Sequence, residues 1–351
     1  LMSGVLLVIL AAAASFGVPA LIGNPAGIYL MTTKIYTYQK MGSLSGIYQS
    51  GAISIILLIL AIIILVVNQK ILSRDHFKTV SGKTSRHSLI DLGKWKGVIS
   101  FFLAIFIFIL FILPILGISF TALSKIQGKF ELSNLGFQNF HKVFFEVNET
   151  PRAFRNSLVL AFVVATVATF FGMIMSYINV KTRIKGRSLI EIFASLPYAT
   201  PGTVLALAFI LSFSGGIWGI KIALYNTLFM IGLAYFAKYL NFAIRTTGDG
   251  FGQIDDCLSE AARVSGASWG TTLTTIWFPL MKPALVASWF LIFMPAFSEL
   301  TMTILLTGPG LETMGTLLFQ LQEYGDASGG GAAVLSLTVI VAVGIINIFV
   351  K

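Results

Sequence analysis

The chain has 351 residues, of which 56% are hydrophobic and 11% are charged, and its net charge is +10. Soluble domains carry about a quarter charged residues, so this composition and a mean hydropathy of +0.88 exclude a soluble globular protein. The single cysteine, Cys257, excludes a disulfide framework within the chain. The three histidines, His76, His87 and His141, are scattered over loops on both sides of the predicted membrane, and no cluster of catalytic or metal-ligand residue types stands out.

Long apolar segments predict helices that cross a membrane. A span needs roughly 20 apolar residues, and a helix satisfies its own backbone hydrogen bonds inside lipid. Eight segments have this character, at about 1–22, 51–67, 97–120, 156–178, 190–213, 222–244, 281–306 and 331–350. We therefore expect an all-α polytopic membrane protein with about eight spans, embedded in a lipid bilayer.

Lys and Arg residues crowd alternate loops, above all 68–96 and 179–189. Loops rich in these residues face the cytoplasm, which also places 245–280 and the C-terminus there. Because topology accounts for the basic charge, we expect no nucleic-acid partner. Lys238 lies inside a predicted span, and we expect its long side chain to reach the cytoplasmic interface.

The chain contains an internal repeat. Leu1–Gly23 lies over Leu285–Thr307 at an offset of 284, and Met31-Thr32-Thr33 meets Met314-Gly315-Thr316 at 283. Both copies run in the same direction on the charge map. The alternative is that any two hydrophobic spans can be aligned. The repeat predicts that 1–70 holds the last two spans of an N-terminally incomplete first module. A basic cytoplasmic linker, 71–94, then leads to a complete six-span module, 95–351.

The predicted cytoplasmic loop 245–280 carries a short amphipathic helix. Asp255 and Asp256 suit a helix start, and Gly266 suits a left-handed helix end. Apolar residues recur between them at helical spacing, and the pair Ala261-Ala262 lets another surface approach the backbone closely. An apolar face on this helix indicates that a partner protein docks there. The alternative is that the helix packs against the protein's own bundle.

This loop resembles the EAA loop of binding-protein-dependent ABC importer permeases. The resemblance rests on the spacing of Glu260, Ala261, Ala262, Gly266, Ile276 and Pro279, with Phe278 where the family usually has Leu. It implies a coupling helix that sits in a groove of an ABC ATPase dimer. ATP and Mg would then belong to the partner, and this chain would be neither an enzyme nor a cofactor protein. A phosphate-binding loop at 81–84 is rejected, because Phe77 stands where its first glycine is needed.

Three further segments resemble the two-module permeases of the ferric iron, thiamine and related importers. They are Leu196–Val204, Phe297–Leu306 with the following Gly308-Pro309-Gly310, and Ser15–Gly23. This resemblance implies a type I ABC importer (MetI-like) fold in a bacterial inner membrane and an extracytoplasmic solute-binding protein as partner. Ferric iron is the first choice of solute, with thiamine, phosphonate or another small anion as alternatives. A secondary transporter or a membrane enzyme is the rival class.

Four residues are candidates for the solute path or a gate: Pro197, Pro201, Gly202 and Glu299. Proline removes a helix donor, and irregular backbone at membrane depth is tolerated where it is buried or lines a cavity. A packing kink would explain the prolines and glycine equally well. Glu299, expected about 12 Å below the outer surface in span 281–306 by helical rise, faces either the path or a hydrogen-bonding partner. Candidate partners are Thr301, Thr303 and a carbonyl near Pro201.

Overall fold

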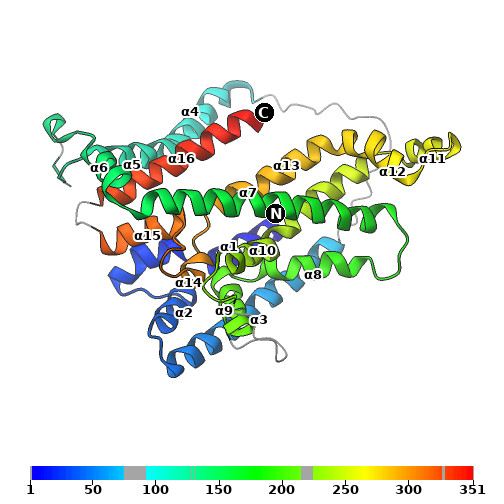
Figure 1. Ribbon diagram of the computed structural model, residues 1–351. Coiled ribbons are helices and arrows are strands. Elements are labelled where there is room, and N and C mark those ends of the chain that lie inside the picture. The colour runs from blue at the N-terminus through cyan, green and yellow to red at the C-terminus, as the bar shows by residue number, and fades with distance from the viewer. Residues whose placement is uncertain are drawn as a thin grey trace.

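The computed structural model describes residues 2–74, 92–126, 128–129, 131–214, 224–325 and 329–350. Every regular element in these ranges is a helix, which confirms the predicted all-α class (Figure 1). Most of the predicted basic linker, 75–91, lies outside the described residues, as does most of the predicted outside loop near 214–221.

Four continuous helical runs are long and apolar enough to cross a membrane: Leu44–Asn68, Gly93–Leu123, Glu149–Lys181 and Trp269–Phe297. A fifth candidate is the pair Ser188–Ala199 and Gly202–Phe213, which is bent by 105°. The predicted spans 1–22, 222–244 and 331–350 correspond to the helices α1 (Met2–Ala13), α10 (Leu228–Gln253) and α16 (Gly330–Val350). The described apolar parts of α1 and α16 are short, and α10 is more polar.

The remaining α-helices follow in chain order. They are α2 (Met31–Lys40), α3 (Leu44–Arg74), α4 (Lys96–Ile107), α5 (Leu113–Leu123), α6 (Gln138–His141), α7 (Glu149–Lys181), α8 (Ser188–Ala199), α9 (Gly202–Ser214), α11 (Asp256–Val264), α12 (Trp269–Thr272), α13 (Phe278–Phe297), α14 (Thr303–Leu306) and α15 (Met314–Tyr324). Short π turns extend several of them, at Pro19–Gly23, Phe108–Ile112, Lys142–Glu146 and Leu273–Trp277.

The core of the bundle is formed by α10 packed against α7, α13 and α8. Small residues allow this close approach, because a side chain on Gly172 would begin 2.3 Å from the Ala243 Cβ. Helices in membranes gain packing through such small residues and through polar contacts between helices. Ser176 of α7 supplies one polar contact and donates to the Ile244 carbonyl at 2.7 Å.

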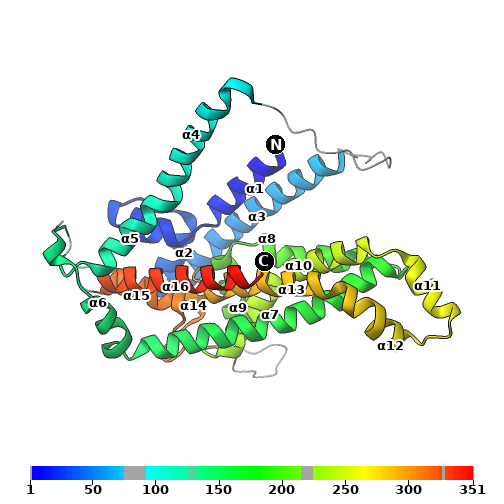
Figure 2. The same cartoon turned by 90° about the horizontal axis from the view of Figure 1, so that it is seen from above.

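Helix α7 runs along the whole bundle and is tied at both ends (Figures 1 and 2). Near its start, the Arg152 Nε lies 3.4 Å from a Glu312 carboxylate oxygen, and the Ser157 hydroxyl accepts from the Met314 N–H at 2.8 Å. Met314 is the first residue of α15. At the other end, Lys181 donates to the Ile254 carbonyl at 2.7 Å, immediately before α11.

The two segments that the sequence aligned share several local features. Thr33 in α2 and Thr316 in α15 each accept a hydrogen bond from the backbone N–H three residues earlier. Gly27 and Gly310, at the same offset of 283, both have φ in the left-handed region, +75° and +86°. The Thr32 hydroxyl donates to the Ser15 carbonyl at 2.7 Å. These likenesses support a repeat, and the division into two modules stays a prediction.

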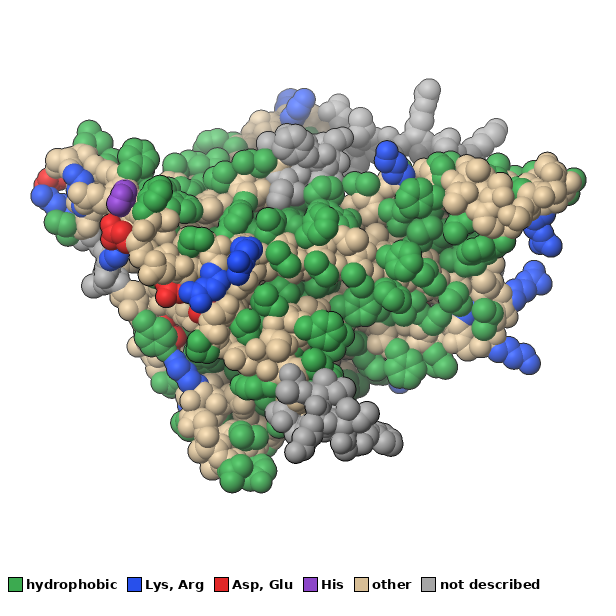
Figure 3. Space-filling model, in the orientation of Figure 1, with side chains coloured by type: hydrophobic (Ala, Val, Ile, Leu, Met, Phe, Trp, Pro, Cys, Tyr) green, Lys and Arg blue, Asp and Glu red, His purple; other side chains and the backbone are tan. Residues whose placement is uncertain are grey.

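The surface has the pattern expected in a bilayer. In the face shown in Figure 3, hydrophobic side chains cover the middle, and charged side chains lie mostly toward its two ends. Helix α4 diverges from the bundle in Figure 2, and the most apolar part of Gly93–Leu123 has no buried residue. Lipid is a suitable environment for such an apolar surface.

Candidate functional site

Helix α11 begins and ends where its sequence predicts. The Asp255 carboxylate accepts from the Cys257 N–H at 3.0 Å, so Asp255 is the N-cap residue. This backbone hydrogen bond is the main cause that lowers the pKa of the Asp255 carboxyl. At the other end, Gly266 has φ +82°, its N–H donates to the Arg263 carbonyl, and the Ala267 N–H donates to the Ala262 carbonyl, both at 3.0 Å. This is the Schellman pattern, which requires a left-handed residue.

The apolar side of α11 does not pack on the chain itself. No residue of this helix is buried. Leu258 is 42% exposed and Val264 is 90% exposed, while Ala261 is also exposed. Large apolar side chains in water are costly unless another surface covers them. Within the described residues, the structure therefore argues against a loop helix folded back on its own bundle.

An aromatic cluster at the base of α11 holds the loop in place. The Trp277 ring lies 5.1 Å from Tyr177 and 5.3 Å from Phe251, which joins α7, α10 and the start of the last long span. The Trp269 indole N–H donates to the Tyr177 hydroxyl at 3.0 Å. Phe251, Trp277 and Met281 are buried here. The exposed helix α11 thus lies next to a buried aromatic cluster.

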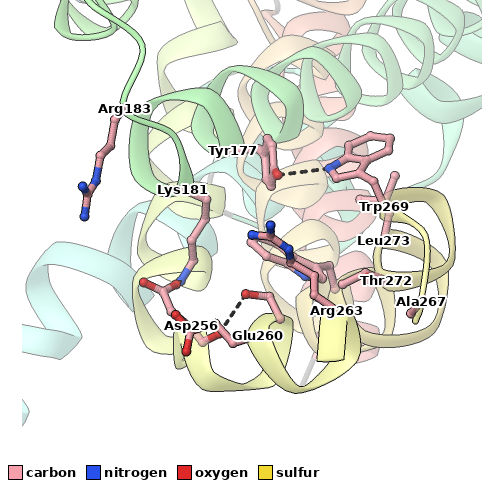
Figure 4. Close-up of a pocket in the computed structure, with 12 residues that line it drawn as sticks. Tyr177, Lys181, Arg183, Asp256, Glu260, Arg263, Ala267, Trp269, Thr272 and Leu273 are labelled. Carbon is pink, nitrogen blue, oxygen red and sulfur yellow. Dashed lines mark hydrogen bonds and ion pairs between the residues drawn. The ribbon is translucent and has the colours of Figure 1, made fainter. Parts of the chain in front are cut away.

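A cavity of about 600 Å³ lies between α11, α12 and the end of α7 (Figure 4). The Lys181 amine approaches the Asp256 carboxylate to 2.5 Å. Glu260 and Arg263 line the same cavity from α11, so its wall carries charges of both signs. A concave surface with this lining can receive a polar segment of another protein.

The other predicted residues of the loop lie at the same end of the bundle. Ile276 packs against the aromatic cluster. Pro279 follows the π turn Leu273–Trp277 and continues into α13. Because proline has no N–H for the preceding turn, a local π turn is a suitable connection. The structure thus brings Glu260, Ala261, Ala262, Gly266, Ile276 and Pro279 into one region.

A second candidate site lies where two helices are interrupted. Helix α8 ends at Ala199 and α9 begins at Gly202, while α13 ends at Phe297 and α14 begins at Thr303. The two interruptions meet, since a side chain on Gly202 would begin 2.9 Å from the Thr301 Cγ2. We call residues 200–202 and 298–302 the junction. The predicted interruption at Pro201 and Gly202 is confirmed, whereas Pro197 lies inside α8 and lines an apolar groove instead.

The prediction that 281–306 is one span is wrong, and so is the depth derived for Glu299. Glu299 lies in the junction, where one carboxylate oxygen accepts from the Tyr239 hydroxyl at 2.6 Å and the other from the Met302 N–H at 2.9 Å. The carboxylate therefore caps the start of α14, where helix N–H groups lack partners. Neither Thr301 nor Thr303 is its partner. Thr303 bonds to Tyr235.

The Lys238 side chain was expected to extend to the cytoplasmic interface, but it turns to a backbone carbonyl inside the bundle instead. Its amine donates to the Thr200 carbonyl at 2.5 Å and is part-buried. Thr200 is the C-cap residue of α8, and a cation is favourable at that end of a helix. The junction therefore uses a cation at one broken helix end and an anion at the other.

Tyr235 and Tyr239 were not among the residues predicted from the sequence. Together with Lys238 they recur on α10 at positions i, i+3 and i+4, which share one helix face. Lys238 and Tyr239 bond to the junction, and Tyr235 bonds to Thr303, the residue that directly follows it. This polar spacing in an otherwise apolar helix is a signal that could have identified them.

Gly202 supplies a test of the junction. We expect Gly202→Ala to lower the melting temperature, because its new methyl group would be forced against Thr301 and Met302. Overpacking of this kind costs about 1–3 kcal/mol. Gly248→Ala is the matched control, since its nearest neighbour would be at 3.9 Å and alanine is a better helix former. Equal melting temperatures for the two purified variants would show that the two interruptions are not in close contact.

The fold and these two sites define a class of protein. It is a multi-pass membrane protein with an exposed amphipathic helix, α11, at one end of its bundle. Residues 168–351 match the family described as "Binding-protein-dependent transport system inner membrane component". The chain belongs to this family, whose members are permease subunits of ABC importers.

Curated relatives match the chain at moderate identity. It is 26% identical over 98% of its length to the ferric transport system permease protein FbpB of Actinobacillus pleuropneumoniae, covering 49% of that protein. It is 27% identical to a putative ferric transport permease of Haemophilus influenzae, over 86% of this chain and 46% of the relative. The chain thus spans about half the length of these relatives. A sulfate permease of Escherichia coli matches at 29% identity over 52% of this chain and 70% of the relative.

Among solved structures, a chain of a bacterial ABC transporter for the acidic polysaccharide alginate has a similar fold. Its TM-score is 0.61 at 17% identity, and the match covers 72% of this chain and 92% of that one. This likeness supports the predicted type I importer fold and says nothing about the solute.

Proposed function

We propose that this chain forms the translocation path of an ATP-driven importer and receives force from an ABC ATPase dimer through α11. The observation that carries the proposal is an amphipathic helix without buried residues, next to a buried aromatic cluster. Binding of the ATPase would cover Leu258 and Val264, and closure of the dimer would push the helix. The permease halves would then alternate between inward-open and outward-open states, with no covalent chemistry in this chain.

This proposal fixes the orientation of the molecule. The end that carries α11 and α12 faces the cytoplasm, in agreement with the basic loop 179–189 that lies beside it. The opposite end, which carries α15 and the start of α7, faces the outside and meets the solute-binding protein (Figures 1 and 2). The C-terminus then lies on the cytoplasmic side, and ATP and Mg bind to the partner.

Ferric iron is the proposed solute. Two ferric transport permeases are similar over 98% and 86% of the chain. Sulfate and spermidine/putrescine permeases match shorter parts, 52% and 54%. A sulfate, polyamine, thiamine or phosphonate importer is the alternative of the same class. The two-module organisation is also part of the proposal, with residues 1–70 in the first module and 95–351 in the second.

Co-purification and uptake test the proposed function together. The protein is expressed together with a candidate ABC ATPase and a candidate solute-binding protein, purified through a tag and reconstituted in vesicles. We expect the ATPase to co-purify and ATP to drive uptake of radioactive iron supplied on the binding protein. Unlabelled sulfate and spermidine serve as competitors.

Three results would count against the proposal in different ways. Uptake that needs an ion gradient but no ATPase would indicate a secondary transporter. ATP-dependent uptake that is blocked by unlabelled sulfate or spermidine would indicate that the blocking compound, and not iron, is the solute. An ATPase that still co-purifies after Leu258→Asp and Val264→Asp would show that α11 is not its docking site.

A further inference from the structure

Residues related by the repeat touch each other between α2 and α15. Tyr36 and Phe319, which differ by 283 positions, have ring centroids 5.9 Å apart at an interplanar angle of 82°. Phe16 packs against both rings, at 5.3 Å from Tyr36 and 5.7 Å from Phe319. The same cluster holds Leu300, which is the repeat equivalent of Phe16. This contact lies away from α11 and α12 (Figure 2).

A polar pair repeats the relation at the rim of this contact. Lys40 and Glu323 differ by 283 positions, and the Lys40 amine lies 3.9 Å from a Glu323 carboxylate oxygen. The same amine donates to the hydroxyl of the neighbouring Tyr324. When equivalent residues of two copies meet, the local two-fold axis passes between them. We call Phe16, Tyr36, Lys40, Phe319, Glu323 and Tyr324 the seam. The seam therefore lies on the axis that relates the two repeats.

The seam has a closed apolar part and an open polar part. Phe16 and Phe319 are buried. A cavity of about 470 Å³ lies beside them, lined by Tyr36, Gln39, Lys40, Tyr225, Gln320, Glu323 and Tyr324 among others. Burial and the neighbouring Glu323 raise the pKa of Tyr36 to about 12, so its phenol keeps its proton at neutral pH. The apolar part thus borders this cavity, the basin, whose lining includes both polar and apolar side chains.

In secondary transporters built from repeats, the solute binds at the repeat interface, and one repeat moves against the other. An ATP-driven importer built from two like modules can use the same geometry. We propose that the seam is the outer gate of the translocation path, closed in this structure, with Lys40 as a latch across the axis. The basin is then the first surface of this chain that a released solute meets. This inference rests on the proposed import function.

A reversible cross-link tests the gate. Lys40→Cys and Tyr324→Cys are introduced into a Cys257→Ser chain, because Cys257 is exposed. Lys40 is 50% and Tyr324 is 63% exposed, so both new cysteines are accessible to a series of bis-methanethiosulfonate reagents with increasing spacer length. A protease site inserted within 75–91 separates the two residues into different fragments. Cross-linked fragments then stay together on a gel until dithiothreitol is added.

We expect the cross-link to lower ATP-driven uptake at least tenfold, and dithiothreitol to restore it. The matched control is His141→Cys with Glu146→Cys, a pair that is 3.2 Å apart, 67% and 60% exposed, and within one repeat. Its cross-link leaves uptake unchanged if the seam must part. Each cysteine variant is first measured without reagent, so that the effect of the bridge is separated from the effect of the substitution.

Each other outcome has a definite meaning. Joined fragments with normal uptake would overturn the gate and leave the import function standing. Failure of the reagent to join the fragments would show that α2 and α15 are apart in the intact protein, which also overturns it. Absence of ATP-driven uptake in the wild-type chain would instead reject the import function, and the gate with it. Because Cys257 lies in α11, uptake by the Cys257→Ser parent is compared with the wild type before any cross-link is made.

Discussion

Gly266→Val is expected to abolish ATP-driven uptake while the membrane bundle stays folded. Gly266 has φ +82° and closes α11 through two backbone hydrogen bonds. For a residue with a side chain, the left-handed conformation costs about 1–2 kcal/mol of conformational energy. The cost is higher for a β-branched residue. Among the described residues beyond its two chain neighbours, no atom lies within 4 Å of the new Cβ, so we expect the loss to come from the backbone and from the docking fit. Uptake and solute-stimulated ATPase activity are the measurements.

The control for this prediction is Gly266→Asn. Asparagine tolerates the left-handed region better than other residues with a side chain, so this variant should keep much of the uptake that valine loses. Both proteins should melt at nearly the wild-type temperature, because α11 buries no residue of its own. Wild-type uptake by Gly266→Val would show that the helix end has no part in coupling.

Glu299→Ala is expected to destabilise the bundle. Its removal leaves the Tyr239 hydroxyl and the Met302 N–H without their acceptor. An unsatisfied buried group costs about 1–3 kcal/mol, and the free end of α14 loses its cap. The melting temperature of the purified variant, measured in the same detergent as the wild type, reports the effect.

Glu299→Gln separates the two roles that the sequence left open. Glutamine keeps an acceptor for the Met302 N–H and can donate to the Tyr239 oxygen, so the capping role predicts stability and uptake close to the wild type. A path role needs the charge itself. Loss of uptake by Glu299→Gln at a normal melting temperature would therefore assign the carboxylate to the path, in spite of the two hydrogen bonds.

Helix α11 could be predicted in detail because the signals for its two ends are local. Asp255 and Gly266 determine where α11 begins and ends, and both act on backbone groups within a few residues. The same holds for the interruption at Pro201, which removes a donor from its own helix. Signals of this kind need no knowledge of which helices are neighbours.

The junction could not be predicted in full because its contacts are distant in sequence. Hydropathy reports only that 281–306 is apolar, and it does not detect that α13 stops at Phe297. Lys238 was assigned to the interface from its distance along α10, whereas its partner is the Thr200 carbonyl, 38 residues away. The acceptor for the Tyr239 hydroxyl is 60 residues away. Only the arrangement of helices brings these groups together.

Helix α7 determines how far a local displacement travels. It has 33 residues, so it is about 50 Å long at 1.5 Å per residue, and it contains no proline beyond its first turn. One end holds the chain just before α11 through Lys181, and the other holds the first residue of α15 through Ser157. A straight helix that is bonded to other segments at both ends moves as one body, so a shift at one end displaces the other. A push of a few ångströms at α11 would therefore reach α15 with little loss, and α15 carries Phe319 and Tyr324 of the seam.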